Sequence, residues 1–496
     1  MVKARFPYKI FWGEIHTHTS FSDGKRTPEE QVVIARTHLD FWAVTDHAVV
    51  ITAEQDAAGT KPGSTMKRVR QYWSRTQRVM AKHNEPGKFV TFLGYEISTT
   101  KEGDFNVYYL DDHRPIYTGR CMAEIYRQLR KERAIVIPHH SAYKIGKRGI
   151  SWKIVENDLT PLVEVYSMHG SSESDNGLFP MTWQSMGPRE TGGTVRRALD
   201  GGLKMGFIAS SDDHKGYPGG YTLGLVAALV KDLTREELWD TFTHRRTYAV
   251  TGDRIYLDFG INGSFMGEEI RSAGKRQIRA HIIGCDVLDR LDLIKNGRVI
   301  NRFTNIQEPK KEEKDGNYQV KFRLEWGWGG SSNLEKRRKN PVIMPWTGRL
   351  SIKKGELLSA SPCFGDPPPN EIQSLTDREC VWISTTDREP RRYNRESTNS
   401  IVFEVRGKET TMIELEMNST NLKFTLGDIL RDSHVIFLGD MFDERIKVHQ
   451  GVTFNQFSKD IKFEDSVVEK AIDYYYLRVI QANGQAAWSS PVWIKS

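Results

Sequence analysis

The sequence has few cysteines and no long hydrophobic run. Its four cysteines are scattered over 496 residues and form no CxxC pair, so they do not make a disulfide framework and fit a reducing compartment. No stretch approaches the roughly 18 apolar residues of a transmembrane helix. The start of the chain, MVKARFPYKIFWGEIH, also lacks the apolar core of a signal peptide. These absences predict a cytoplasmic protein without a membrane partner.

Neither basic nor acidic residues are concentrated in one part of the chain. The net charge is +7 and the pI about 9.0, but basic residues are interleaved with acidic ones along the chain. A dedicated nucleic-acid surface is therefore not expected. With 38% hydrophobic and 27% charged residues, the composition is that of a globular protein. Its length predicts two or three domains.

The first half of the chain alternates short apolar runs with helical patterns. Helix-like stretches such as TPEEQVVIARTH and CMAEIYRQLRKE separate the runs. This alternation predicts an α/β region with a parallel sheet, open or closed into a barrel. The apolar runs, each of which contains or ends in a polar residue able to bind metal, are DFWAVTDH (40–47), KFVTFLGYE (88–96), AIVIPHH (134–140), LVEVYSMHG (162–170) and KMGFIASSDDH (204–214).

The pattern changes near residue 255. Beyond it, alternating and aromatic-rich strands are joined by Asn-Gly-type turns, which is typical of an all-β, sandwich-like domain. We therefore predict an α/β domain over residues 1–255 and a β-rich domain over 256–496. A loop-rich segment is expected around 330–400, where DPPPNE and several charged runs occur. The tryptophans Trp326, Trp328 and Trp346 are interpreted as core residues, with a sugar-binding platform as the alternative.

The segment GEIHTHTSFSDG, residues 13–24, places His16 and His18 two positions apart. On a strand this spacing puts both imidazoles on one face. Asp23 follows in a Ser-Asp-Gly turn that can fold back toward them. Two same-face histidines suit a divalent metal ion. Taken alone, the segment fits a buried histidine pair beside a surface turn equally well.

The other strand ends favour the metal site. Functional side chains of α/β folds gather at the carboxyl ends of parallel strands, and here successive strands end in histidines and carboxylates. So many ligands predict two or three divalent ions of Zn, Mn or Fe rather than one. The candidates beyond the first segment are Asp46, His47, Glu96, His139, His140, His169, Asp212, Asp213 and His214.

In combination, HTHTSFSDG, TDH, a strand-end Glu, PHH and DDH resemble the PHP (polymerase and histidinol phosphatase) superfamily over roughly residues 10–250. The stretches HGSSE, IASSDDHKGYPGG, RRTYAVTG and AWSSPVWI are similar to a large, poorly characterised PHP-like branch with a β-rich C-terminal extension. The resemblance implies a distorted (β/α)7 TIM-like barrel with two or three metals. The ligands it implies are His16, His18, Asp23, His47, Glu96, His139, Asp212 and His214.

One position departs from the family pattern. A further histidine usually follows the glutamate, but this chain has EGDFNVYYLDD there. Asp104, Asn106 or His169 are the alternatives for completing the third metal position, and all three remain open at this stage.

The resemblance implies a metal-dependent hydrolase, and we expect a phosphoesterase. Asp46, His140 and Asp213 are the candidates for proton transfer. Arg189, Arg196 and Lys215 are the candidates to neutralise an anionic small-molecule substrate, phosphorylated or carbohydrate. A hydrolase or lyase acting on a non-phosphate carbohydrate or amide is the alternative, and a binding protein with a degenerate site is another. A homo-oligomer is compatible with the sequence.

Overall fold

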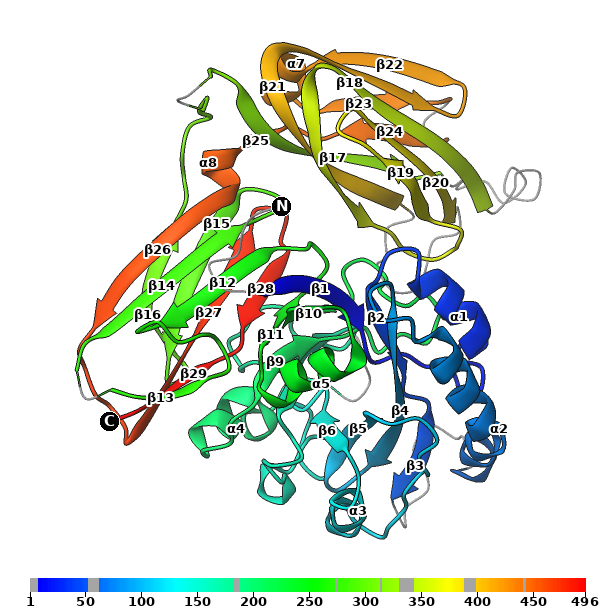
Figure 1. The fold of residues 1–496 in the computed structure, drawn as a ribbon, viewed down its shortest axis with the longest axis vertical. Helices are drawn as coiled ribbons and strands as arrows, with labels where there is room; N and C mark the ends of the chain where they lie inside the picture. Colours follow the sequence, from blue (N-terminus) through cyan, green and yellow to red (C-terminus); the bar gives the residue numbers. More distant parts are fainter. Residues whose placement is uncertain are drawn as a thin grey trace.

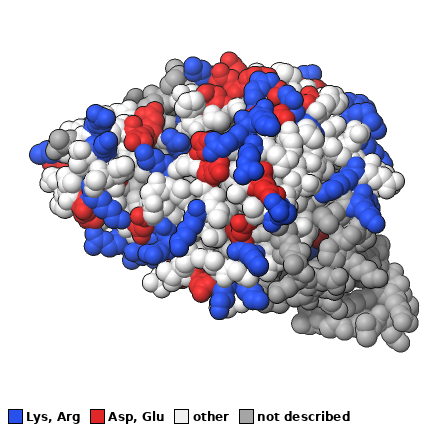
Figure 2. Space-filling view, turned by 90° about the horizontal axis from the view of Figure 1, so that it is seen from below, with Lys and Arg blue, Asp and Glu red and all other residues white. Residues whose placement is uncertain are grey.

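A computed structural model describes residues 8–51, 62–181, 187–272, 274–312, 315–329, 343–387, 398–439 and 443–496. Figure 1 shows three regions: an α/β region formed by the N-terminal half, a β region beside it, and a second β region above both. None of the helices in these ranges combines the length and the apolar composition that crossing a membrane requires. On the face drawn in Figure 2, Lys and Arg side chains are interspersed with Asp and Glu.

The α/β region contains the strands and helices that the sequence predicts. Thr27 and Glu30 form a capping box at the start of the first helix, with Pro28 in its first turn. The elements are β1 (Lys9–Glu14), α1 (Pro28–Ala35), β2 (Phe41–Val44), β3 (His47–Ile51), α2 (Pro62–His83), β4 (Val90–Thr99), β5 (Gly103–Tyr109), α3 (Met122–Leu129), β6 (Ala134–Pro138), β7 (Leu162–Ser167), β8 (Gly170–Ser171), α4 (Val195–Asp200), β9 (Gly206–Ala209), β10 (Leu225–Val230), α5 (Arg235–Thr243) and β11 (Thr247–Val250).

The strands that precede the candidate ligands run in parallel, whereas β5, β10 and β11 are antiparallel members of the region. β1 is parallel to β2 and β2 to β4, while the antiparallel β5 lies between β4 and β6. β7 and β9 pair in parallel in a separate small sheet. Two backbone hydrogen bonds, Asp212 N to His16 O (2.9 Å) and His18 N to Asp213 O (3.0 Å), join the extensions of β9 and β1. The strand extensions that carry the histidines therefore meet at one place.

The prediction of an α/β region followed by a β-rich region is confirmed. Within the described residues, the strands of the α/β region are divided between two sheets, so closure into a barrel stays a prediction.

The β-rich half contains two units. The first is built from both ends of this half: β12 (Tyr256–Ile261), β13 (Glu269–Arg271), β14 (Arg276–Ile283), β15 (Leu288–Lys295), β16 (Arg298–Thr304), β26 (Ser458–Asp465), β27 (Ile472–Gln481), β28 (Ala486–Ser489) and β29 (Val492–Lys495). The second lies between them in the sequence: β17 (Tyr318–Gly327), β18 (Ile343–Cys363), β19 (Glu371–Leu375), β20 (Glu379–Asp387), β21 (Thr398–Met417), β22 (Thr420–Thr425), α7 (Leu426–Arg431), β23 (His434–Phe437), β24 (Arg445–Val448), β25 (Val452–Thr453) and α8 (Phe454–Phe457). Figure 1 shows the second unit as the upper region.

The expectation of a loop-rich segment around 330–400 is wrong for its described part. β18 runs for 21 residues, and β19 and β20 pair beside it in the same sheet. Charged residues cover the exposed face of β18 and hide its alternation. Pro345 lies where β18 pairs with β20, and Pro362 where it pairs with β21. Each proline can thus turn its nitrogen away from the one paired neighbour. Residues 330–342 and 388–397 lie outside the described ranges.

The predicted boundary near residue 255 is crossed by a continuous sheet. β11, the last strand before it, pairs with β28, and β28 pairs with β27. Hydrogen bonds of Glu173 also cross this boundary. Its carboxylate accepts from Tyr476 Oη (2.7 Å), Arg478 Nη1 (2.9 Å) and Trp488 Nε1 (2.9 Å). The two regions therefore share both a sheet and a buried polar network.

Candidate metal centre

The two histidines of the first segment lie just beyond the end of β1, in an extended stretch. Both side chains are fully buried. Glu14 fixes the stretch, because its carboxylate accepts hydrogen bonds from the backbone nitrogens of His16 (2.8 Å) and Ser211 (2.9 Å). Burial raises the pKa of Glu14 to about 8. The histidines are thereby held beside the extension of β9.

The turn that follows brings Asp23 back to the histidines, as predicted. Asp46 holds this turn: its carboxylate accepts from Thr19 N (2.7 Å), Thr19 Oγ1 (2.6 Å) and Ser22 Oγ (2.6 Å). Gly24 is required there, since a Cβ at that position would lie 2.3 Å from the His18 carbonyl oxygen. These contacts give Asp46 a structural role, and they do not support its predicted role in proton transfer.

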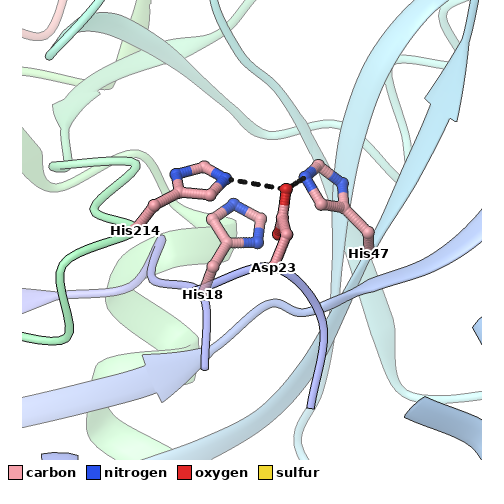
Figure 3. A group of neighbouring side chains, drawn as sticks. All are labelled: His18, Asp23, His47 and His214. Atoms are coloured by element: carbon pink, nitrogen blue, oxygen red, sulfur yellow. Dashed lines mark ion pairs between the residues drawn. The ribbon is translucent and has the colours of Figure 1, made fainter. Parts of the chain in front are cut away.

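Asp23 lies between two histidines from different strand ends. Its Oδ2 atom is 3.6 Å from His47 Nε2 and 3.5 Å from His214 Nε2. Figure 3 shows both imidazoles turned toward this carboxylate, with His18 beside it. The ligand atoms of the four residues all lie within 4.8 Å of one another, so they could hold one metal ion.

A second group forms a closer cluster around Glu96 and Asp212. Asp212 Oδ1 lies 3.4 Å from His16 Nε2 and 3.1 Å from His18 Nε2. Glu96 Oε2 lies 3.5 Å and 3.3 Å from the same two nitrogens. Four tetrahedral bonds of about 2.1 Å separate ligand atoms by about 3.4 Å. The four distances are close to that value, and the ligand atoms of His16, His18 and Asp212 all lie within 4.8 Å of one another, so these three residues could hold one metal ion.

Glu96 offers its other carboxylate oxygen to different histidines. Oε1 is 3.1 Å from His47 Nδ1 and 3.7 Å from His139 Nε2, so this carboxylate has the position of a bridging ligand. The sequence places Glu96 at the end of a strand, but β4 continues to Thr99 because it forms a hairpin with β5.

The three alternatives for the third predicted position have different surroundings, and His169 lies against Asp212. Its Nε2 atom lies 2.9 Å from Asp212 Oδ2, and its Nδ1 atom is 2.6 Å from the Tyr143 hydroxyl. Asp104, in contrast, pairs with Arg148 through the guanidinium Nε at 2.7 Å. Asn106 is the cross-strand partner of Glu96. Both side-chain polar atoms of Asn106 are buried without a hydrogen-bond partner among the described residues, so the choice among the three alternatives stays a prediction.

Two residues that orient the ligands were missed by sequence analysis. Glu164 Oε2 lies 2.9 Å from His16 Nδ1, a contact that fixes which imidazole nitrogen faces the cluster. The Tyr143 hydroxyl fixes the orientation of the His169 imidazole in the same way, through its contact with Nδ1. A signal for Glu164 was present, because a glutamate inside the apolar run LVEVYS must face a partner when that strand is buried.

The cluster holds most of its acids ionised and several histidines neutral. Burial lowers the pKa of His18 to about 3, and His214 and His47 add to this effect. Burial opposes ionisation of Asp212, yet His16 and His169 hold its pKa well below the usual value. Burial also opposes protonation of His16, but Asp212 and Glu164 outweigh it and raise its pKa. A metal bound at His16 would have to displace that proton.

The donor set fits divalent metal ions. In the described part of the chain, several buried donor and acceptor atoms of the cluster have no hydrogen-bond partner: Nε2 of His16, Nδ1 of His18, both ring nitrogens of His139 and Oε2 of Glu96. Leaving such atoms unpaired costs about 1–3 kcal/mol each, and metal coordination would satisfy those that point inward. Imidazole and carboxylate ligands together suit Zn, Fe or Mn.

The remaining proton-transfer candidates differ in position. His140 lies against the cluster, with Nε2 3.3 Å from Asp104 Oδ2. It also has a positive φ of 31°, a strained conformation of the kind found at active sites. Asp213 accepts a hydrogen bond from Tyr217 N (2.9 Å) and so holds the loop after the DDH motif. His140 is therefore the better placed of the two.

Two of the three predicted substrate-binding cations serve other contacts. Arg189 donates to four backbone carbonyls, including those of Ser171 and Gly177, and so holds its own loop together. Arg196 lies over Gly297 of the β-rich half and 3.6 Å from Asp200. Lys215 is half-buried, one residue after His214. The sequence shows where arginines such as Arg189 and Arg196 occur, but it does not show which carbonyl or carboxylate oxygen each one contacts.

Arg148, which sequence analysis did not select, is the cation beside the cluster. It is bound to Asp104, and its Nη2 atom lies 4.0 Å from Glu96 Oε1. Its side chain is 34% exposed, so it can meet both the cluster and solvent.

Comparison with known proteins gives relatives without an assigned activity. A family profile described as "Protein of unknown function (DUF3604)" matches residues 52–116. An uncharacterised protein of Chlamydia pneumoniae is 28% identical over 256 residues, which is 47% of this chain and 40% of that protein. An uncharacterised protein of Chlamydia muridarum is 25% identical over 320 residues, 59% of this chain and 49% of that one. The chain thus spans about half or less of the curated relatives that it matches.

Among solved structures, the chain is similar to a two-domain protein from Bacteroides vulgatus, described as containing a predicted PHP-like metal-dependent phosphoesterase. That similarity has a TM-score of 0.33 and 13% sequence identity, and covers 86% of this chain and 97% of the other.

Proposed function

We propose that this protein is a metal-dependent hydrolase that uses two or three divalent ions. One observation carries the proposal: the ligand atoms of His16, His18 and Asp212, all buried, lie within 4.8 Å of one another, beside Glu96. Asp23, His47 and His214 would hold a second ion with His18, and Glu96, His139 and His169 would supply further ligands. Together with the PHP-like motifs, this arrangement supports a distorted barrel whose strand ends converge on the site.

The residues around the cluster would divide the chemistry of hydrolysis among them. Bound divalent ions would lower the pKa of a coordinated water toward neutrality, which supplies hydroxide at physiological pH. His140, buried beside His139 and paired with Asp104, is placed to move a proton to the leaving oxygen. Glu164 and Tyr143 keep two imidazoles in a fixed orientation.

Within this class, we propose a phosphoesterase. The PHP-like motifs support it, as does Arg148, which offers a guanidinium suited to phosphate oxygens beside the cluster.

The alternative is a hydrolase or lyase acting on an uncharged substrate such as a carbohydrate or amide. A specific observation favours it: Arg189 and Arg196 make contacts elsewhere, and the charge of Arg148 is already balanced by Asp104. Apart from the divalent ions themselves, these side chains therefore offer little uncompensated positive charge to a phosphate dianion.

Metal analysis combined with turnover tests the proposal. We expect the purified protein to carry two or three equivalents of Zn, Mn or Fe by elemental analysis, and chelator-treated protein to regain activity on 4-nitrophenyl phosphate when metal is returned. His18→Ala should lose metal and activity together, while the matched change His434→Ala, on the distant strand β23, should lose neither. Turnover that persists in metal-free His18→Ala protein would refute the metal-dependent mechanism.

The same assay separates the two substrate classes. Turnover of 4-nitrophenyl phosphate or bis(4-nitrophenyl) phosphate supports the phosphoesterase, whereas turnover of 4-nitrophenyl glycosides alone supports the alternative. Metal-loaded protein that turns over no substrate of either kind would contradict both.

A further inference from the structure

A cavity lies away from the candidate metal ligands, where the α/β region meets both β units. Its volume is about 500 Å³, within the range of about 300–1,000 Å³ typical of small-molecule sites. The loop that follows His214 forms one wall, strands β17, β21 and β24 form another, and the β27–β28 turn closes a third side. No part of the metal-ligand set lines it.

The walls of this cavity carry groups of both charges, held in place by partners. Arg323 donates to Asp253 Oδ1 (2.7 Å) through Nη2 and to Ser400 Oγ (2.9 Å) through Nη1. Glu325 lies 2.7 Å from His449 Nε2. Because these side chains are fixed before a ligand arrives, little conformational entropy is lost when they bind one.

Lys447 is a cation in the wall of the cavity, as is Arg323, and Glu325 and Asp366 are the lining acids. Lys447 lies on β24 directly opposite Glu325 in the strand register, yet it makes no ion pair with any residue in the described ranges. Arg323 and His449 both have acidic partners. The cavity therefore has one positive charge available for an anionic group.

Three aromatic residues, Tyr217, Tyr221 and Trp328, also line the cavity. Trp328 has a φ of +60°, and Thr222 beside Tyr221 has a φ of +68°. Left-handed conformations are rare for bulky and β-branched residues, and such strain clusters at ligand sites. The other tryptophans that the sequence singled out, Trp326 and Trp346, are buried in the core. Only Trp328 of the three tryptophans is free to meet a ligand.

We propose that this cavity is a binding site for an acidic sugar of one or two rings. Sugar hydroxyls both donate and accept hydrogen bonds, which matches walls with groups of both charges. The flat apolar face of a sugar ring fits against Trp328 and Tyr221, and a carboxylate or sulfate substituent pairs with Lys447. The proposal is independent of the reaction at the metal centre.

The cavity is connected to the metal centre by a short loop. Tyr217, which lines the cavity, donates its backbone N–H to Asp213, next to the metal-ligand candidates Asp212 and His214. A sugar bound in the cavity therefore rests on the loop that positions two ligands. The site can hold part of a larger substrate or a separate effector.

Calorimetric titration of the full chain tests the proposal with glucuronic acid, glucose and acetate as probes. We expect glucuronic acid to bind, glucose to bind at least tenfold more weakly, and acetate not to bind. Lys447→Met should weaken glucuronic acid at least tenfold and leave glucose unchanged, and Trp328→Ala should weaken both sugars. Lys423→Met, an exposed lysine on β22, is the matched control and should change nothing.

The metal-ligand variant His18→Ala separates this site from the metal centre. Glucuronic acid should bind His18→Ala as it binds the unaltered protein, even if the proposed hydrolase activity is absent. Three results would overturn the proposal: no binding of either sugar, binding lost in His18→Ala, or equal effects of Lys447→Met and Lys423→Met. Unfolding temperatures of all variants show whether a loss of binding reflects a loss of fold.

Discussion

Replacing Glu173 by alanine should destabilise the protein strongly, because this carboxylate joins the α/β region to the β-rich half. It is 2% exposed and accepts hydrogen bonds from Tyr476, Arg478 and Trp488. Hydrogen bonds to a charged group contribute about 1.5–3 kcal/mol each, and removing one partner of a buried ion pair costs about 3–5 kcal/mol. These contributions overlap, so we expect a loss of about 4 kcal/mol.

Differential scanning calorimetry measures this loss as a fall of about 10 °C in the first unfolding transition. Glu173→Gln keeps the shape and one acceptor, so we expect roughly half of the effect. Glu464→Ala is the matched control: its side chain is 49% exposed and pairs with Lys275 on the surface, where an ion pair contributes about 1 kcal/mol or less. Equal shifts for Glu173→Ala and Glu464→Ala would refute the argument that the buried network holds the regions together.

Three further changes test the site and the electrostatics. Asp46→Ala leaves Thr19 without its acceptor and frees the turn of Asp23, so elemental analysis should find about one metal equivalent fewer; an unchanged metal content would refute this. Arg148→Met should raise KM for 4-nitrophenyl phosphate at least tenfold with a smaller change in kcat, and an unchanged KM would remove Arg148 from the substrate site. Burial, assisted by Arg254, lowers the pKa of His38 to about 4. Between about pH 6.5 and pH 4 the imidazole is therefore protonated in the unfolded state and neutral in the folded state. The free energy of unfolding accordingly decreases as the pH is lowered through this range. Urea unfolding between pH 7 and 5 should show a smaller decrease in the free energy of unfolding for His38→Gln than for the unaltered protein. Equal decreases would contradict a lowered pKa of His38.

The convergence of the candidate ligands was predictable because one physical rule brings their strand ends together. His16, His47 and His139 follow strands that run in the same direction, and parallel strands bring their ends together. The sequence pattern of each strand was sufficient to locate its end within a few residues. Predicting that these strand ends meet did not require the sheet to close into a barrel.

The partners of charged side chains were not predictable in this way. Arg189 and Arg148 both lie in loops near the site, but only the folded backbone decides that Arg189 meets carbonyl oxygens and Arg148 meets Asp104. Glu164 was missed because its strand was interpreted from its apolar residues. The long strand β18 was missed because alternation with charged residues resembles a solvated loop when no neighbouring strand is known.

The pairing of β11 with β28 has a consequence for the timing of synthesis. Thr247 and Ser490, whose hydroxyls meet beside this pairing, are 243 residues apart in the chain. At roughly 5–20 residues per second, the ribosome needs about 12–50 s to make the intervening segment. During that interval the α/β region has an unpaired strand edge, which is a template for association with other chains. Chaperone binding to the nascent chain during this interval would therefore protect the unpaired edge of β11 from association.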